Sequence, residues 1–119
     1  MDDERLGGSI LEELEMVSFK VISASGAAKS LFMEAMQYAR KREFEKAEER
    51  IKEGEESRQQ GHEAHFELIQ KEASGDPVSI TLLLMHAEDQ LMSSETIKII
   101  AEEMIENYKA ISLLEKKAK

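Results

Sequence analysis

The sequence predicts an all-α protein, an antiparallel up-down-up bundle of three helices that assembles into a homotrimer. Three observations lead to this prediction. Apolar residues recur every three or four positions along most of the chain, which is the spacing of one helix face. Gly75 and the single proline, Pro77, mark one clear boundary between periodic segments. The last segment is apolar around most of its circumference, more than two neighbouring helices can cover.

Length and composition favour one helical domain, residues 1–119. The chain has 119 residues, of which 41% are hydrophobic and 34% are charged, and it has no cysteine. Disulfides, thiolate metal sites and thiol nucleophiles are therefore excluded. The acidic start lacks the features of a signal peptide, and no apolar run is long enough to span a bilayer. We expect a cytoplasmic protein.

The charge and the motifs exclude further classes of function. A formal net charge of -9 repels phosphate backbones, so nucleic acid is not an expected partner. The sequence contains no glycine-rich phosphate loop, no zinc signature of the His-Glu-x-x-His type and no serine nucleophile elbow.

The first helix is expected from about Ser9 to Tyr38. Gly26 lies inside it, where a glycine weakens the helix but allows another backbone to approach closely. The predicted packing stripe consists of Ile10, Leu14, Val17, Val21, Ala24, Ala28, Leu31, Ala35 and Tyr38.

The second helix follows the charged residues 40–43 and is polar outside its stripe. Its end is predicted at Ser74, where Gly75 can supply the C-terminal cap and Asp76-Pro77 can cap and open the next helix. The predicted stripe consists of Phe44, Ala47, Ile51, Gly54, Gly61, His62, His65, Ile69 and Ala73.

The third helix is expected from about Pro77 to Lys116. A helix that is apolar nearly all round must be buried on more than one side, so self-association is the natural inference. One face holds Leu82, Leu83, Ile97, Ile100, Met104, Tyr108 and Ile111, whereas Leu84, Met85, Leu91, Met92 and Ile99 lie around the rest.

The candidate site lies on the third helix. His86, Asp89, Gln90 and Ser93 fall within one arc of this helix, because their spacing is i, i+3, i+4 and i+7. The arc is otherwise apolar. A buried aspartate is costly without a partner, so Asp89 should meet a cation, a protonated group or a metal ion. The stripe of the second helix can bring two more histidines to the same interior region, His62 and His65.

Structural explanations remain open for each of these residues. His86 can be a hydrogen-bonded packing residue, and Asp89 can pair with a lysine or arginine of a neighbouring helix. His62 and His65 can be seam histidines bonded to the backbone or to each other. Glu88 lies about 160° from His86 around the helix, and is expected to be an exposed surface carboxylate.

The segment from Val78 to Met92 resembles the lactose/cellobiose-type enzyme IIA subunits of the bacterial phosphotransferase system. Their hallmark is His-(Ala/Gly)-Gln-Asp-His-Leu-Met after an apolar lead-in, and residues 86–92 read His-Ala-Glu-Asp-Gln-Leu-Met. The resemblance extends in order to residues 28–31, 43–47 and 68–75, and so covers most of the chain.

This resemblance implies a homotrimer of three-helix subunits. It assigns to His86 the phosphohistidine, which receives its phosphoryl group from phospho-HPr and passes it to enzyme IIB. It assigns to Asp89 a place on the trimer axis, where three carboxylates bind a structural divalent ion, expected to be Mg. The implied partners are HPr, enzyme IIB and the IIC membrane permease system. The implied cargo is a β-linked disaccharide of the lactose, cellobiose or chitobiose type.

Two positions depart from the hallmark: Glu88 stands where Gln is usual, and Gln90 stands where the second His is usual. In the family, a His of the second helix is followed three residues later by Gln. His62 matches that His, and His65 replaces the Gln. One hypothesis is that an imidazole lost at position 90 is regained at His65. Gln90, His62 and His65 are then candidates to bind the phosphoryl group or orient the ring.

Three functions therefore remain open: a phosphohistidine relay, a regulatory or scaffolding trimer with impaired transfer, and a helical interaction module with His86 as a packing residue. Phosphorylation by phospho-HPr distinguishes the first from the second. The third predicts that His86→Ala changes stability without abolishing any activity.

Overall fold

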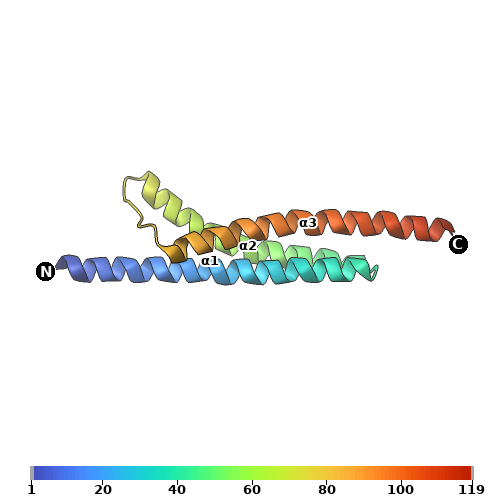
Figure 1. Cartoon of the computed structure of the whole chain (residues 1–119), viewed down its shortest axis with the longest axis horizontal. Coiled ribbons are helices and arrows are strands. Elements are labelled where there is room, and N and C mark those ends of the chain that lie inside the picture. The colour runs from blue at the N-terminus through green and yellow to red at the C-terminus, as the bar shows by residue number, and fades with distance from the viewer. Residues whose placement is uncertain (1, 119) are drawn as a thin grey trace.

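The computed structural model describes the backbone of residues 2–118 and the side chains of residues 10–118. It consists of α1 (Asp2–Arg40), α2 (Phe44–Ala73) and α3 (Leu82–Ala118), and the described backbone contains no strand. The three helices run up, down and up along a rod of 78 × 20 × 19 Å (Figure 1). The prediction of an all-α antiparallel three-helix bundle is confirmed for the single chain.

A left-handed residue follows each of the first two helices, α1 and α2. After α2, Gly75 has φ +93°, its N–H donates to Glu72 O at 3.1 Å, and the Asp76 N–H donates to Lys71 O at 3.1 Å. This is the Schellman pattern, and it confirms the predicted cap at Gly75. After α1, Arg42 takes the same place with φ +66°, a conformation that usually favours glycine.

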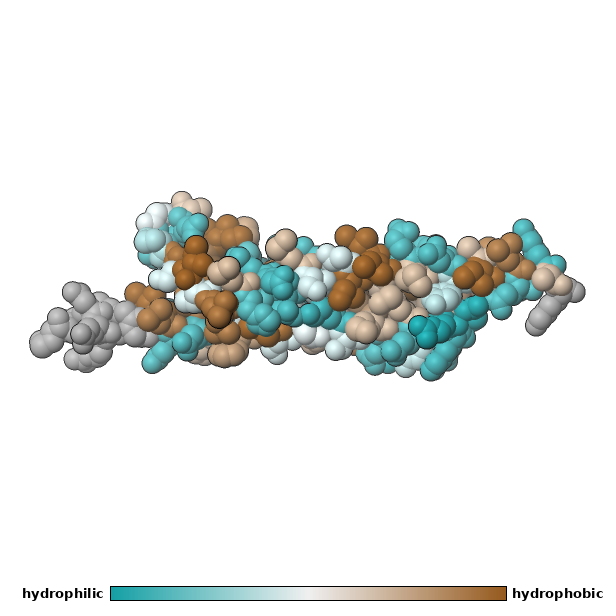
Figure 2. Space-filling model, in the orientation of Figure 1, coloured by the Kyte–Doolittle hydropathy of each residue, from teal (hydrophilic) through white to brown (hydrophobic). Residues whose placement is uncertain are grey.

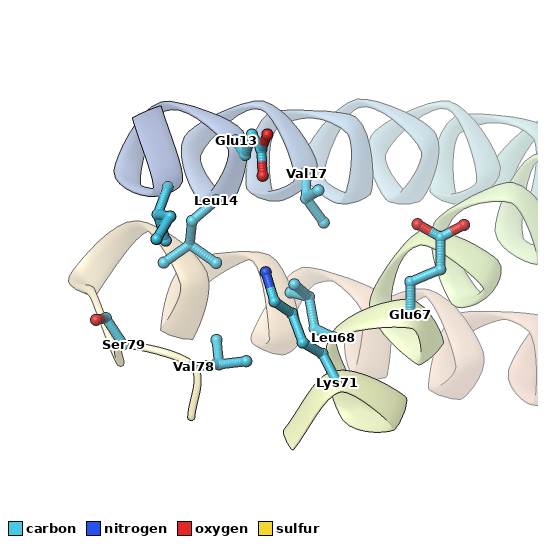
Figure 3. A pocket seen from close by; sticks show the side chains of 9 residues that line it. Glu13, Leu14, Val17, Glu67, Leu68, Lys71, Val78 and Ser79 are labelled. Carbon is cyan, nitrogen blue, oxygen red and sulfur yellow. The ribbon is translucent and has the colours of Figure 1, made fainter. Parts of the chain in front are cut away.

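The predicted start of the third helix at Pro77 is wrong. Residues 76–81 are not helical, and α3 begins at Leu82, where Thr81 Oγ1 accepts a hydrogen bond from the Leu84 N–H at 3.0 Å. Thr81 is therefore the N-cap. The intervening segment crosses the end of the bundle, where Val78 and Ser79 line a cavity with Leu14 and Val17 of α1 (Figure 3).

Small residues allow the three helices to pack closely. The core consists of three clusters along the rod, and the fully buried Phe32 is its largest member. The clusters are Val21, Ala64, Ala87 and Leu91; Ala28, Phe32 and Ala101; and Ala35, Ala39, Ala47 and Ile105.

The close approach expected at Gly26 occurs at two other glycines. Apart from the nearby backbone of α1 itself and the two residues adjoining Gly26, no described atom lies within 4 Å of the place where a Gly26 Cβ would stand. A Cβ on Gly54 would lie 2.5 Å from the Phe32 ring, and one on Gly61 would lie 3.4 Å from the Ala24 Cβ. The contact between α1 and α2 thus requires glycine at Gly54, leaves room for a Cβ at Gly61, and makes no such demand at Gly26.

The stripe predicted for the second helix is confirmed only as far as Gly61. Ala47 and Gly54 are buried, and Gly61 is buried as expected, but the next buried residue is Ala64. His62 and Ala73 are exposed, and Ile69 is 49% exposed. Figure 1 shows the reason: the last turns of α2 diverge from α1, so that residues there no longer face a packed neighbour.

α3 exposes a long apolar face opposite the face that it buries. Its buried residues include Leu84, Ala87 and Leu91. Large apolar side chains are exposed elsewhere along it, and hydrophobic patches lie over α3 (Figure 2). They are Leu82, Met85, Met92, Ile99, Ile100, Ile111, Leu113 and Leu114. The predicted apolarity around the helix is confirmed. Even so, no helix in the described part of the chain is long and apolar enough to cross a membrane.

Candidate functional site

His86 lies one turn after the start of α3, and its side chain is exposed. The Thr81 cap holds this first turn in helical geometry. Among residues 10–118, no side-chain hydrogen bond or ion pair engages the imidazole. The explanation of His86 as a hydrogen-bonded packing residue is therefore wrong for the single chain, and both ring nitrogens are available to a partner.

Gln90 lies one turn further along α3, where α3 packs on α1. Its side chain is half-buried, and Gln90 Oε1 accepts a hydrogen bond from Lys29 Nζ of α1. Residues four apart on a helix are neighbours, so this bond brings the Lys29 ammonium to a residue that adjoins His86. Ser93, also half-buried, lies two turns beyond His86 and about one turn beyond Gln90.

Lys29 is a candidate site residue that the sequence pattern did not single out. The available signal was its position next to Ala28, a core residue of α1, which puts Lys29 at the edge of the packed face. A lysine at such an edge extends its stem along apolar surface and delivers its charge to the neighbouring helix.

Asp89 is exposed in the single chain, so no other part of the same chain buries its carboxylate. It lies on the same side of α3 as the exposed Met85 and Met92. Within the part of the chain that the structure describes, no group of three or more His, Asp or Glu is placed to hold a metal ion. A metal at Asp89 would need carboxylates from other copies of the chain.

His65 and Glu88 form a pair between α2 and α3. His65 Nε2 donates to Glu88 Oε1 at 2.7 Å, and the exposed fractions of these side chains are 17% and 49%. Glu88 is exposed as expected, and the pairing with His65 is what the sequence did not predict. Because Glu88 lies about 160° around α3 from His86, His65 is engaged on the far side of the helix. This contradicts the hypothesis that His65 supplies an imidazole beside His86.

His62 points away from the packed part of α2. It is exposed, and its ring stacks on Phe66 of the same helix, with ring centroids 6.3 Å apart and 17° between the planes. The prediction that three histidines and Asp89 share one interior region is therefore wrong for the single chain. The structure brings together His86 and Gln90, with Lys29 added.

A charged cluster joins α2 to α3 away from His86. Arg58 bonds to Glu55 at 2.6 Å and to Glu95 at 3.1 Å, and Lys98 lies 3.0 Å from Glu55. The hydrogen bond from Arg58, followed by that from Lys98, lowers the pKa of Glu55 to about 2. Since it lies more than two turns along α3 from His86, this cluster stabilises the bundle and does not belong to the site.

Comparisons with known proteins give the family. A model of the family described as "PTS system, Lactose/Cellobiose specific IIA subunit" matches residues 16–109. The chain is 38% identical over 101 residues to the lichenan-specific phosphotransferase enzyme IIA component of Bacillus subtilis, covering 85% of this chain and 92% of that protein. It is 34% identical to the lactose-specific EIIA component of Staphylococcus aureus, covering 82% and 95%.

A solved structure agrees with the sequence comparisons. The cellobiose-specific enzyme IIA of Bacillus anthracis superposes with a TM-score of 0.80 at 38% identity, covering 82% of this chain and 90% of that one. The match spans the helices that carry His86, Gln90 and Lys29. The resemblance read from the sequence is confirmed, and the chain belongs to the lactose/cellobiose-specific IIA family of the phosphotransferase system.

Proposed function

We propose that this protein is a phosphoryl carrier of the phosphoenolpyruvate-dependent sugar phosphotransferase system. His86 accepts a phosphoryl group from phospho-HPr and passes it to enzyme IIB. The observation that carries the proposal is the exposed His86 imidazole near the start of α3, at the first position of the family's motif. An exposed ring is what two different partner proteins must reach in turn.

Histidine suits this reversible transfer. The lone pair of one neutral ring nitrogen of His86 attacks the phosphorus of the donor phosphohistidine, and a new N–P bond forms. The donor's N–P bond breaks, and its electron pair stays on the donor's nitrogen. The other His86 nitrogen keeps its proton. Such transfers have loose transition states, so the protein needs mainly to align the groups and stabilise spread negative charge.

The exposed apolar face of α3 supports a homotrimer. Leu82, Met85, Met92 and Ile100 form a stripe on this face, and Asp89 lies in its middle. Packing three such faces around an axis buries the stripe and brings three carboxylates together. Their repulsion requires a cation, and oxygen ligands favour a divalent ion such as Mg. This ion is structural, because the transferred charge is at His86.

Asp89→Leu tests the assembly. Apolar packing in place of carboxylates and metal should leave a trimer that no longer binds the ion. Sedimentation gives the oligomeric state, and metal analysis of the purified protein gives the ion. A monomeric variant would show that the metal is essential to the trimer, whereas a monomeric wild type would contradict the proposal.

The downstream partners follow from the family. HPr and enzyme IIB use overlapping surface around His86, and enzyme IIB serves a IIC membrane permease. The relatives' names include lichenan, lactose and cellobiose, which supports a β-linked disaccharide or oligosaccharide as the transported sugar.

Phosphorylation tests the central proposal. The protein is incubated with phosphoenolpyruvate, enzyme I and HPr, and its intact mass is measured under alkaline conditions that preserve phosphohistidine. We expect one phosphoryl adduct on the wild type and on His62→Ala, the matched control, and none on His86→Ala. A folded wild type without an adduct would favour the alternative, a regulatory or scaffolding homologue with impaired transfer, for which the Gln90 departure is the supporting observation.

A further inference from the structure

Lys29 and Gln90 are joined across the contact between α1 and α3, beside His86. Lys29 Nζ donates to Gln90 Oε1. Gln90 follows His86 by one helical turn, so their Cβ atoms lie about 6 Å apart. Gln90 and Lys29 are both half-buried, whereas His86 is exposed. The pair therefore lies on the side of α3 that adjoins His86, where α3 meets α1.

The bond from Lys29 fixes the direction of the Gln90 amide. An amide carries one acceptor oxygen and one NH2 group with two donors, whereas an ammonium can only donate. Lys29 must therefore bind the oxygen, whichever way the amide is first placed. Both N–H groups of Gln90 are left to donate elsewhere, and a phosphoryl oxygen on His86 is an acceptor one turn away.

Lys29 also brings a charge that the phosphorylated state needs. A phosphoryl group adds nearly two negative charges at neutral pH. In residues 10–118, no ion pair joins Lys29 to a carboxylate, so its charge is not already neutralised by one. Hydrogen bonds between charged groups are about twice as strong as neutral ones, and partial burial reduces the screening of Lys29 by salt.

We infer that Gln90 binds the phosphoryl group carried by His86, and that Lys29 is its positioning residue: Lys29 orients the Gln90 amide and offsets the added charge. This inference rests on the proposed function. It also gives Gln90 a reason to stand where the family has a second histidine. An amide N–H and an imidazole N–H both donate a hydrogen bond, provided that the amide is held in the right direction, as Lys29 holds it here.

The test is the equilibrium of phosphoryl exchange with HPr. The full-length protein is mixed with phospho-HPr and HPr at fixed ratios, and the fraction carrying the adduct is measured by intact mass. Lys29→Met removes the charge and the donor at nearly constant volume. Lys29→Arg keeps both. Gln90→Glu keeps an acceptor for Lys29 but removes the N–H donors. The matched control is Lys20→Met, at an exposed position of the same helix.

Lys29→Met and Gln90→Glu should each lower the exchange equilibrium constant about tenfold or more, because each removes an interaction with the phosphoryl group that only the phosphorylated state makes. Lys29→Arg should restore most of the wild-type value, and Lys20→Met should match the wild type. A merely structural role of Lys29 would change thermal stability without moving the exchange equilibrium in a folded variant.

Two results would overturn the inference. One is wild-type exchange in folded Lys29→Met and Gln90→Glu, with the adduct still absent from His86→Ala; the relay role would then stand without this pair. The other is a loss in Lys29→Arg as large as that in Lys29→Met. A wild type that takes no adduct would refute the proposed function together with this inference, and is recognised before any variant is made. If Lys29→Met does not fold, the exchange equilibrium of Gln90→Glu, a change on α3 instead of α1, tests the inference.

Discussion

Replacing Gly54 with alanine should destabilise the protein by about 2 kcal/mol, although alanine is the better helix former. The new Cβ would lie 2.5 Å from Phe32 Cε1, 2.8 Å from Cδ1 and 3.1 Å from Cζ. Carbon atoms in contact prefer about 3.5–4.0 Å, so the ring or the helix must retreat by about 1 Å. Phe32 is fully buried against Ala28 and Ala101, and has no open space to enter.

The magnitude follows from two opposed effects. Overpacking a tight core costs about 1–3 kcal/mol, and the upper end applies because the contact is with a fixed aromatic ring. Alanine in place of glycine returns about 1 kcal/mol through helix propensity. The net loss is about 2 kcal/mol. With a urea slope of roughly 1–3 kcal/mol per molar, this moves the unfolding midpoint down by about 1 M.

Urea unfolding, followed by circular dichroism at one fixed protein concentration, measures this change. Gly61→Ala is the control on the same helix, since its Cβ would meet Ala24 at 3.4 Å and Leu91 at 3.6 Å, which are ordinary contacts. It should leave stability unchanged or raise it by up to about 1 kcal/mol. Phe32→Leu in the Gly54→Ala background should cost less than the two single changes summed. A Gly54→Ala protein at least as stable as the wild type would refute the reasoning.

Three further predictions concern a buried hydroxyl, a helix cap and an acid. Ser25 Oγ is buried without a hydrogen-bond partner in the described residues, so Ser25→Ala should raise the free energy of unfolding by about 1 kcal/mol, measured by urea unfolding. Thr81→Val should cost about 1 kcal/mol of stability, because α3 loses its N-cap, while Thr81→Ser should retain it. The pKa of Glu55 falls from 4.5 to about 2 on folding, so its contribution is present above pH 4.5 and is lost as the pH falls through about 2. Glu55→Gln should therefore flatten the pH dependence of the free energy of unfolding in that window, by no more than about 1 kcal/mol, because the cluster with Arg58 is partly exposed. Urea unfolding at several pH values measures the change.

The sequence predicted the parts of the fold that depend on one continuous periodicity. In α1, the predicted stripe is confirmed at every second member: Leu14, Val21, Ala28 and Ala35 are buried. The members between them, Val17, Ala24, Leu31 and Tyr38, are only partly buried, Ile10 is exposed, and the buried positions are instead Ser18, Ser25, Phe32 and Ala39. Helical arithmetic gives the face to within one residue, because positions i+3 and i+4 lie on either side of its centre. The same arithmetic put Glu88 on the far side of α3 from His86, but it could not show that His65 would bind it there.

The parts that it missed depend on choices between similar local signals. Asp76 and Thr81 are both good N-cap residues, and only the need to cross the end of the bundle makes Thr81 the cap. In the second half of α2, a stripe through His62 competes with one through Ala64. The divergence of α2 from α1 decides between them, and that geometry belongs to the whole chain rather than to any local pattern.

The polar residues that follow His86 on α3 point in different directions and have different neighbours. Their positions decide which departure from the family motif affects phosphoryl transfer. By helical arithmetic Gln90 lies about 40° to one side of His86, Asp89 about 60° to the other, and Glu88 nearly opposite. Glu88 is hydrogen-bonded to His65 of α2, and His65 is itself a departure from the family pattern. The changes at positions 65 and 88 therefore compensate each other, on the side of α3 away from the His86 imidazole. Gln90 adjoins His86 and is held from α1. The efficiency of phosphoryl transfer should therefore depend on position 90 and be indifferent to position 88.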